Sequence, residues 1–292
     1  MPIRLVVTDM DNTLYSWIDY IVPSLEAMMS AVCQATGYPR IRVVQSLKAV
    51  YSKYESNEYP FALQESSLFH EFPDFPSFDK LVIEPARMAF GEARKKYLRP
   101  YKNVESTLIE LKKRGVPAVA LTDAPRNPAE QRAKRMGLDK HLTALYTLPG
   151  FQFPANSQGE TLVAPDIQAK EARGDYRCAC PVIEVPREYE KPNPQGLLQI
   201  CEKYSVEPSQ VLVIGDSLRK DVGVAKAVGA LDCWAEYGTY LSLEYRERLD
   251  IVSAASVTRR HAASVMEGEV PRTATHRVSN FEQILSIIDS RA

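Results

Sequence analysis

Three short apolar segments rich in β-branched residues recur along the chain, at Ile3–Thr8, Pro117–Leu121 and Val211–Ile214. Each is bounded by turn residues and is followed by polar residues and then by a helix-like spacing of apolar side chains. Continuous apolar strands that alternate with helices are typical of a parallel sheet that is buried on both faces. The pattern therefore predicts an α/β protein, and it limits where polar side chains can gather.

Residues 15–99 separate the first two predicted strands, which is far more than one crossover helix requires. Helix-like apolar spacing recurs within this segment, and Pro- and Gly-containing stretches interrupt it. The four helical stretches are Leu25–Ala35, Ile41–Tyr54, Leu63–Phe69 and Phe78–Leu98. We expect residues 15–99 to form a small all-helical cap domain, inserted into a core of residues 1–14 and 100–292.

A second irregular segment spans residues 150–186, which are rich in Pro, Gly and polar side chains. We expect a long loop insertion within the core, with room for a hairpin, that lies beside the mouth of the active site and either borders the cap or contacts another subunit. Further along, residues 241–266 have a charged helical pattern, and an amphipathic helix near Ile284 and Ile288 ends the chain. This last helix is expected to pack against the sheet.

Charge and cysteine content exclude several classes of protein. The 292 residues carry 36 Lys and Arg against 37 Asp and Glu, a net charge of −1, so no overall field favours nucleic acid or an anionic membrane. Five cysteines are odd in number and mostly scattered, which argues against a disulfide framework and favours a cytoplasmic location. The sequence contains no recognisable signal peptide and no apolar run long enough to span a membrane.

Four polar clusters lie at the ends of predicted strands or in the loops that follow them. In an open parallel sheet, ligands bind at the carboxyl ends of the strands, so residues remote in sequence converge there. The clusters are Asp9-Met10-Asp11-Asn12-Thr13, Thr122-Asp123, Lys191-Pro192-Asn193-Pro194, and Gly215-Asp216-Ser217 with Asp221.

Convergence of four carboxylates, those of Asp9, Asp11, Asp216 and Asp221, is costly unless some are protonated or a cation lies among them. Carboxylate oxygens favour a hard divalent ion such as Mg²⁺. A lysine and a threonine hydroxyl beside such an ion provide what a phosphoryl group needs, namely a positive charge, a hydrogen bond and a metal that neutralises its oxygens.

These clusters resemble the four motifs of the haloacid dehalogenase-like superfamily, and they occur in the same order. Asp9-Met10-Asp11-Asn12-Thr13 matches Asp-x-Asp-x-Thr, and Val119-Ala120-Leu121-Thr122-Asp123 matches a strand that ends in Thr or Ser. Lys191-Pro192 matches the third motif, and Gly215-Asp216 with Asp221 matches Gly-Asp-x4-Asp. The resemblance implies a doubly wound, Rossmann-like core and a helical cap between the first two motifs.

The resemblance also implies roles for individual residues. Asp9 would be the nucleophile that forms an aspartyl-phosphate, and Asp11 the general acid and base. Phosphoryl oxygens would be held by Thr122, Lys191 and backbone N–H groups near Asn12 and Asp123. Mg²⁺ would be bound by Asp9, the Asp11 backbone carbonyl and Asp216, with support from Asp221. Asp11 itself favours phosphoryl transfer, because family members that cleave halides lack an acid at that position.

The expected function is therefore that of a Mg²⁺-dependent phosphatase acting on a small-molecule phosphate ester. A phosphomutase with the same Asp9 and Asp11 chemistry and a catalytically idle binding protein are alternatives that the motifs leave open. Cys178 and Cys180 lack a second Cys/His pair at zinc-ligand spacing, which disfavours a zinc site, and the sequence does not assign them a role. No motif identifies the substrate or the oligomeric state.

Overall fold

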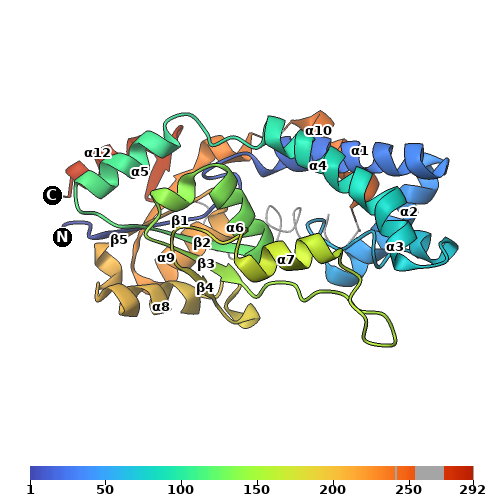
Figure 1. Cartoon of the computed structure of the whole chain (residues 1–292). Coiled ribbons are helices and arrows are strands. Elements are labelled where there is room, and N and C mark those ends of the chain that lie inside the picture. Colours follow the sequence, from blue (N-terminus) through green and yellow to red (C-terminus); the bar gives the residue numbers. More distant parts are fainter. Residues whose placement is uncertain (241, 254–272, 292) are drawn as a thin grey trace.

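The computed structural model describes residues 1–240, 242–253 and 273–291. Its described part contains a seven-stranded, wholly parallel sheet in the order β4-β3-β2-β1-β5-β6-β7 (Figure 1). The strands are β1 (Leu5–Thr8), β2 (Ala118–Pro125), β3 (Ala144–Leu148), β4 (Val182–Glu184), β5 (Val211–Gly215), β6 (Leu231–Ala235) and β7 (His276–Val278). The predicted α/β class and parallel, doubly wound sheet are confirmed.

The sheet is buried on both faces, because alternate residues of its central strands enter two different cores. Val6 and Ala120 belong to one core, Val7 and Val119 to the other. Figure 1 shows α5 (Val104–Lys113) and α12 (Ile284–Asp289) on one side of the sheet, and α8 (Gln195–Tyr204) and α9 (Gly223–Val228) on the other. The final helix packs against the sheet core as expected, since Ile284 and Ile288 are buried in it.

Between β1 and β2 the chain is helical. The segments are α1 (Trp17–Thr36), α2 (Arg40–Tyr54), the 3₁₀ turn η1 (Ser67–Glu71), α3 (Phe75–Phe78), the π-helical turn η2 (Asp79–Ile83) and α4 (Glu84–Tyr97). In Figure 1 these helices lie together at the end of the molecule away from α5 and α12. That residues 15–99 constitute a separate cap domain stays a prediction.

Two of the helical stretches differ from expectation. The stretch predicted at Leu63–Phe69 forms helical turns only from Ser67, as a short 3₁₀ segment. The stretch predicted at Phe78–Leu98 is widened into a π-helical turn before α4 begins. Pro85 occupies the first turn of α4, and because proline has no N–H, the regular ladder of helical hydrogen bonds cannot continue through it.

The long loop expected at 150–186 is corrected in part. It contains α7 (Pro165–Arg173) and ends in the edge strand β4, while an antiparallel bridge joins Ala155 and Thr161. No residue of α7 is buried, so it lacks the apolar stripe by which a helix is recognised in a sequence. The segment does contact the stretch between β1 and β2, through the ring pair Tyr59–Phe151 at 5.0 Å, in which Tyr59 lies between α2 and η1.

The chain after β6 follows the expected order only where it is described. Helix α10 (Leu243–Val252) lies within the predicted charged helix at 241–266, and the rest of that prediction lies outside the described residues. Within the described residues, no helix combines the length and apolarity that crossing a membrane requires.

Candidate active site

The site forms where β1, β2 and β5 end side by side in the middle of the sheet. Asp9 directly follows β1, Thr122 lies within β2, and Asp216 follows β5. Strand β2 was expected to end at Leu121, but it continues to Pro125 with an irregular register beyond Leu121. The parallel arrangement therefore brings together residues that are more than 90 positions apart in the chain, as the sequence predicted.

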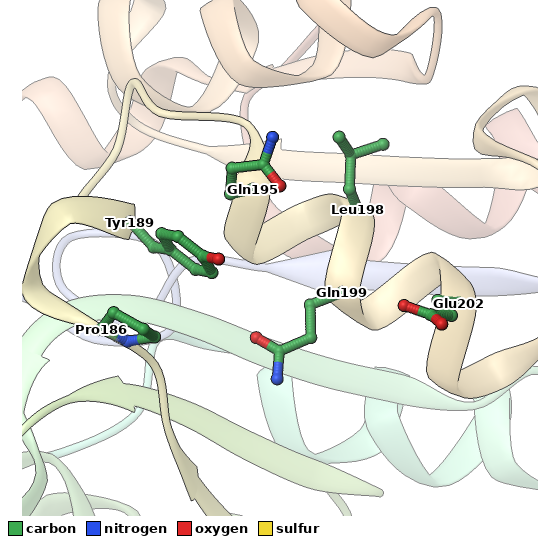
Figure 2. Close-up of a pocket in the computed structure, with 6 residues that line it drawn as sticks. All are labelled: Pro186, Tyr189, Gln195, Leu198, Gln199 and Glu202. Carbon is green, nitrogen blue, oxygen red and sulfur yellow. The ribbon is translucent and has the colours of Figure 1, made fainter.

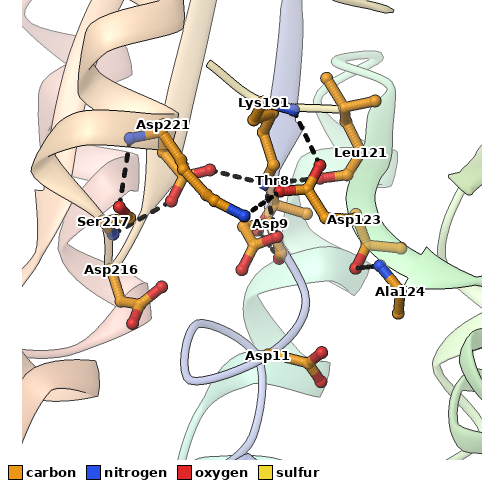
Figure 3. Close-up of polar contacts among 12 residues, drawn as sticks. Thr8, Asp9, Asp11, Leu121, Asp123, Ala124, Lys191, Asp216, Ser217 and Asp221 are labelled. Carbon is orange, nitrogen blue, oxygen red and sulfur yellow. Dashed lines mark hydrogen bonds and ion pairs between the residues drawn. The ribbon is translucent and has the colours of Figure 1, made fainter. Parts of the chain in front are cut away.

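Lys191 connects the carboxylates of this site. Its Nζ lies 2.7 Å from Asp9 Oδ1 and 2.6 Å from Asp221 Oδ1, and it donates to the Leu121 carbonyl at 3.1 Å (Figure 3). Its backbone N–H donates to Asp123 Oδ1 at 3.0 Å. Lys191 is 5% exposed, so this ammonium is held almost entirely by protein groups.

Three carboxylates are placed as a hard cation requires. Asp9, Asp216 and Asp221 each offer an oxygen, and these atoms lie within 4.8 Å of one another. One lysine faces the three acids, so negative charge is in excess at this point. An oxygen donor set of this kind fits Mg²⁺.

The acid–base properties of these groups reflect burial and crowding of like charges. Burial, with Asp221 nearby, raises the pKa of Asp9 to about 7 although Lys191 opposes the rise. Burial and the neighbouring Asp9 and Asp221 raise the pKa of Asp216 well above its usual value. Burial disfavours the charge of Lys191, yet Asp221 and Asp9 raise the pKa of its ammonium. A bound cation would relieve this repulsion.

The Asp11 side chain lies apart from the three clustered carboxylates, as Figure 3 shows. Its Oδ1 accepts a hydrogen bond from the Tyr15 hydroxyl, and its Oδ2 lies 3.3 Å from the Arg132 guanidinium. Burial raises the pKa of Asp11, while Arg132 opposes the rise. The carboxyl group therefore lies away from the three clustered carboxylates, and both its role as general acid and base and ligation through the Asp11 backbone carbonyl stay predictions.

The other predicted phosphate-binding residues lie at the site, and their side chains form contacts with other protein groups. Thr122 is buried, and its Oγ1 accepts from the Ala124 N–H at 3.2 Å. The Asp123 carboxylate accepts from Lys220 Nζ at 2.8 Å, so its side chain is occupied while its backbone stays at the site. Asn12 has a left-handed backbone with a φ of 58°, and its Nδ2 lies 3.5 Å from Asp216 Oδ2.

Sequence reasoning did not predict the steric role of Gly215, and it missed Gly238. A Cβ on Gly215 would lie 2.1 Å from Asp221 Cγ, and one on Gly238 would lie 1.8 Å from the Asn12 carbonyl oxygen. Gly215 stands out in the sequence only as part of a motif. Gly238 has no local signal, because the residue that it approaches is remote in the chain.

Arg132 is a further residue that sequence reasoning missed. It is buried in α6 (Arg126–Arg135), and besides Asp11 it binds Glu58 and, at 3.0 Å, the Tyr20 hydroxyl. Arg126, which follows the second motif closely, forms ion pairs with Glu130 and Glu184 at the start of α6.

A cavity of about 430 Å³ is lined in part by Arg132, the residue that also contacts Asp11. Tyr20, Glu58 and Arg132 line it, together with residues of α4, α6 and the 150–186 segment. A smaller pocket of about 290 Å³, shown in Figure 2, lies between η4 (Arg187–Tyr189) and α8, and none of the predicted site residues lines it. None of the predicted site residues lines the larger cavity either, and its connection to the site is the contact of Arg132 with Asp11.

The fold and the acidic centre define a class of protein: a doubly wound α/β hydrolase whose carboxylates gather at the ends of the parallel strands. Within that class, residues 3–153 and 165–229 match the sequence model of the haloacid dehalogenase-like hydrolases, which is well over half of the chain. The protein belongs to this family, and the resemblance of its four motifs is confirmed.

Curated relatives carry phosphatase names. A glyceraldehyde 3-phosphate phosphatase from Pyrococcus furiosus is 27% identical over 169 residues, which are 56% of this chain and 55% of the relative, so the match spans about half the length of that protein. An N-acetylmuramic acid 6-phosphate phosphatase from Pseudomonas aeruginosa is 25% identical, with 82% of this chain and 84% of the relative covered.

Solved structures share the fold. A 2-haloacid dehalogenase from Pseudomonas syringae superimposes with a TM-score of 0.58 at 16% identity, covering 99% of this chain and 100% of the other. A HAD phosphatase from Thermococcus onnurineus has a TM-score of 0.54 at 17% identity, with the same coverage. These similarities concern the fold.

Proposed function

We propose that the protein is a Mg²⁺-dependent phosphatase that hydrolyses a small-molecule phosphomonoester through an aspartyl-phosphate on Asp9. One observation carries the proposal: Asp9, Asp216 and Asp221 converge at the strand ends with Lys191 bound between two of them. The phosphatase names of the relatives support the same chemistry. The cysteine content also leads us to propose a reducing compartment such as the cytoplasm.

In the first half-reaction, an Asp9 carboxylate oxygen attacks phosphorus and the bond from phosphorus to the ester oxygen breaks. Asp11 donates its proton to the leaving oxygen, for which its raised pKa is suited. In the second half-reaction, Asp11 takes a proton from water, the water oxygen attacks phosphorus, and inorganic phosphate leaves while Asp9 is restored.

Lys191 and Thr122 are assigned to the phosphoryl oxygens. The Lys191 ammonium already lies beside Asp9, so it stabilises the negative charge that accumulates during transfer. Asp9, Asp216 and Asp221 would hold Mg²⁺, with the Asp11 backbone carbonyl as a further ligand. When bound, this ion neutralises phosphoryl oxygens and orients the phosphate.

Replacing the proposed nucleophile tests the proposal directly. Asp9→Asn keeps the shape of the side chain but cannot accept a phosphoryl group as a carboxylate does, so we expect turnover to fall by about 10³-fold or more. Phosphate release from a panel of sugar phosphates and other phosphomonoesters measures it, with Mg²⁺ and with chelator. Asp19→Asn, an exposed position ten residues away, is the control.

The result that overturns the proposal is substantial turnover by Asp9→Asn, or full activity in excess chelator. Product analysis in the same assay separates the alternatives. An isomeric phosphate ester indicates a phosphomutase, and no reaction with any compound indicates a binding protein.

A further inference from the structure

The 430 Å³ cavity that Arg132 lines has a cluster of arginines in its wall. Arg94 of α4 and Arg132 and Arg135 of α6 line it together. In Figure 1, α4, α6 and α7 lie around the same central region of the molecule. The contact of Arg94 Nη1 with Gln131 Oε1 at 3.4 Å confirms that α4 and α6 approach each other here.

Two of these arginines differ from the third in how their charge is balanced. Arg132 is bound to two carboxylates, those of Asp11 and Glu58. Among the described residues, no carboxylate oxygen lies within ion-pair distance of Arg94 or Arg135. The Nε of Arg94 is buried without a hydrogen-bond partner in the part of the chain that the structure describes. Arg135 is exposed to solvent, whereas Arg94 is half-buried, so within the described part of this wall the fold leaves a buried donor of Arg94 unused.

Burying the charged guanidinium of Arg94 is energetically unfavourable. Burial, with Arg135 nearby, lowers the pKa of Arg94 to about 10, so the guanidinium remains protonated at neutral pH while like charges repel it. A buried, charged donor without a partner is unfavourable unless a ligand satisfies it. Phe90 holds the guanidinium over its ring, with the centroid 5.4 Å away, which orients the group but supplies no negative charge.

In the described residues, the wall has three acids, Glu58, Asp79 and Glu171, against four arginines, and two further carboxylates, those of Asp11 and Asp166, contact these arginines from outside it. Glu58 is occupied by Arg132, and the fourth arginine of the wall, Arg87, lies 3.9 Å from Asp166. The remaining acids that line the cavity, Asp79 and Glu171, form no ion pair with Arg94 among the described contacts. The rest of the wall is largely aromatic and aliphatic, with Tyr59, Phe61 and Phe153 among its members.

We propose that Arg94 and Arg135 form an anion-binding subsite, and that the substrate carries a second anionic group, a carboxylate or a phosphate, at the end remote from the phosphoryl group that Asp9 attacks. The inference rests on the proposed phosphatase function. Arg132 connects the cavity with the end of the site where the phosphoryl group would bind, because it lines the cavity and also contacts Asp11. The apolar wall receives the carbon skeleton between the two anions.

A length series of phosphate esters tests the subsite and does not require the substrate to be identified first. Phosphonooxyalkanoates with two to six carbons, written generally as phosphate–(CH₂)n–carboxylate, are compared with the diol monophosphates of equal length, which end in a hydroxyl. The α,ω-diol bisphosphates form the third arm. At the best length we expect kcat/KM for an anionic ester to exceed that of its neutral match by about 10- to 100-fold, as charge-assisted hydrogen bonds provide.

Substitution of Arg94 then assigns the effect to the subsite. In Arg94→Gln the ratio of kcat/KM between anionic and neutral esters is expected to fall by about tenfold or more, and Arg94→Lys to retain part of it. Lys95→Gln removes the same charge from the neighbouring, exposed position of α4, which does not line the cavity, and should keep the ratio. If the carboxylate series has the higher kcat/KM relative to the neutral esters, the second anion is a carboxylate. If the bisphosphate series has the higher kcat/KM, the second anion is a phosphate.

Ratios near one at every length in the unchanged protein overturn the subsite, as does an equal ratio in Arg94→Gln. These outcomes leave the phosphatase proposal intact, since phosphate is still released. If no ester is hydrolysed, the phosphatase proposal fails, and calorimetric binding of ω-phosphonoalkanoates decides the subsite separately. Binding that is equally tight in Arg94→Gln and in the unchanged protein then refutes it.

Discussion

A single buried lysine organises the acidic centre at the scale of individual residues. Lys191 reaches Asp9 and Asp221 from a loop that precedes α8, and it holds both while almost no water reaches it. Burial and the excess of three carboxylates over one ammonium together raise the pKa values of Asp9 and Asp216. The same imbalance that is unfavourable in the metal-free protein favours binding of a divalent cation.

The glycine that ends β5 is the most sensitive neighbour of this centre. In Gly215→Ala the new methyl group would meet the Asp221 carboxyl, so that side chain must move away from Lys191 and from the other carboxylates. We expect the Mg²⁺ concentration for half-maximal activity to rise about tenfold or more. Titration of activity with Mg²⁺ measures it.

Gly223→Ala is the matched control, because its Cβ would meet only the Leu218 carbonyl oxygen at 3.7 Å, an ordinary contact. It should leave the Mg²⁺ dependence unchanged. An unchanged Mg²⁺ requirement in Gly215→Ala would show that Asp221 does not need its observed position.

At the scale of elements, the side chain of Arg132 connects segments that are far apart in the sequence. From α6 it binds Asp11, in the loop after β1, and Tyr20 of α1. It also binds Glu58, which lies between α2 and η1. This buried guanidinium therefore connects a helix beside the sheet to the helical segment that the sequence inserts between β1 and β2.

Removing this connection is expected to lower stability. Arg132→Met leaves the Glu58 and Asp11 carboxylates without their buried partner, and breaking a buried ion pair in this way costs about 3–5 kcal/mol in the free energy of unfolding. Urea unfolding measures the loss. The double variant Arg132→Met with Glu58→Gln should recover part of it, because one orphaned charge is then gone.

Arg173→Met is the comparison for this experiment, since its pair with Asp175 is exposed and should change stability little. A similarly small change for Arg132→Met would mean that the ion pairs of Arg132 do not hold the two parts together.

At the scale of the whole molecule, the acidic centre couples cation binding to global stability and pH. The Asp9 pKa of about 7 is higher than its ordinary value of 3.8, so the metal-free folded protein binds more protons than the unfolded chain between these values. Stability from this group is therefore present at low pH and is lost as the pH rises through about 4 to 7. Mg²⁺ needs the deprotonated carboxylates and competes with those protons.

Mg²⁺ should therefore raise Tm more at about pH 8 than at about pH 5.5. Thermal unfolding with excess Mg²⁺ and with chelator at both pH values measures the two increments. Asp216→Asn removes one proposed ligand and should reduce the increment at the higher pH. Equal increments at both pH values would contradict a cation site made of these carboxylates.

Local sequence patterns were enough to predict much of the fold and the residues of the acidic centre. The runs around Val6, Val119 and Val213 are apolar throughout, and only a strand buried on both faces requires that composition. Asp9, Asp216 and Asp221 could be assigned to one place because parallel strands bring their carboxyl ends to one edge of the sheet. Helix α7 was not predicted, because none of its residues is fully buried and Ile167 is its one large apolar side chain, which is too few to give a helical apolar period.

What the sequence by itself determined is the set of elements and the convergence of the motif residues, since both depend on short-range patterns and on the geometry of a parallel sheet. Only the tertiary structure decided which groups bind Arg132. It also decided that Arg94 has no carboxylate partner among the described residues. Arg132 lies 121 positions from Asp11, and nothing nearby in the chain distinguishes it from the exposed cations of α6. Whether a charge is buried, paired or left free depends on which distant segments fold against it, and local sequence does not encode those contacts.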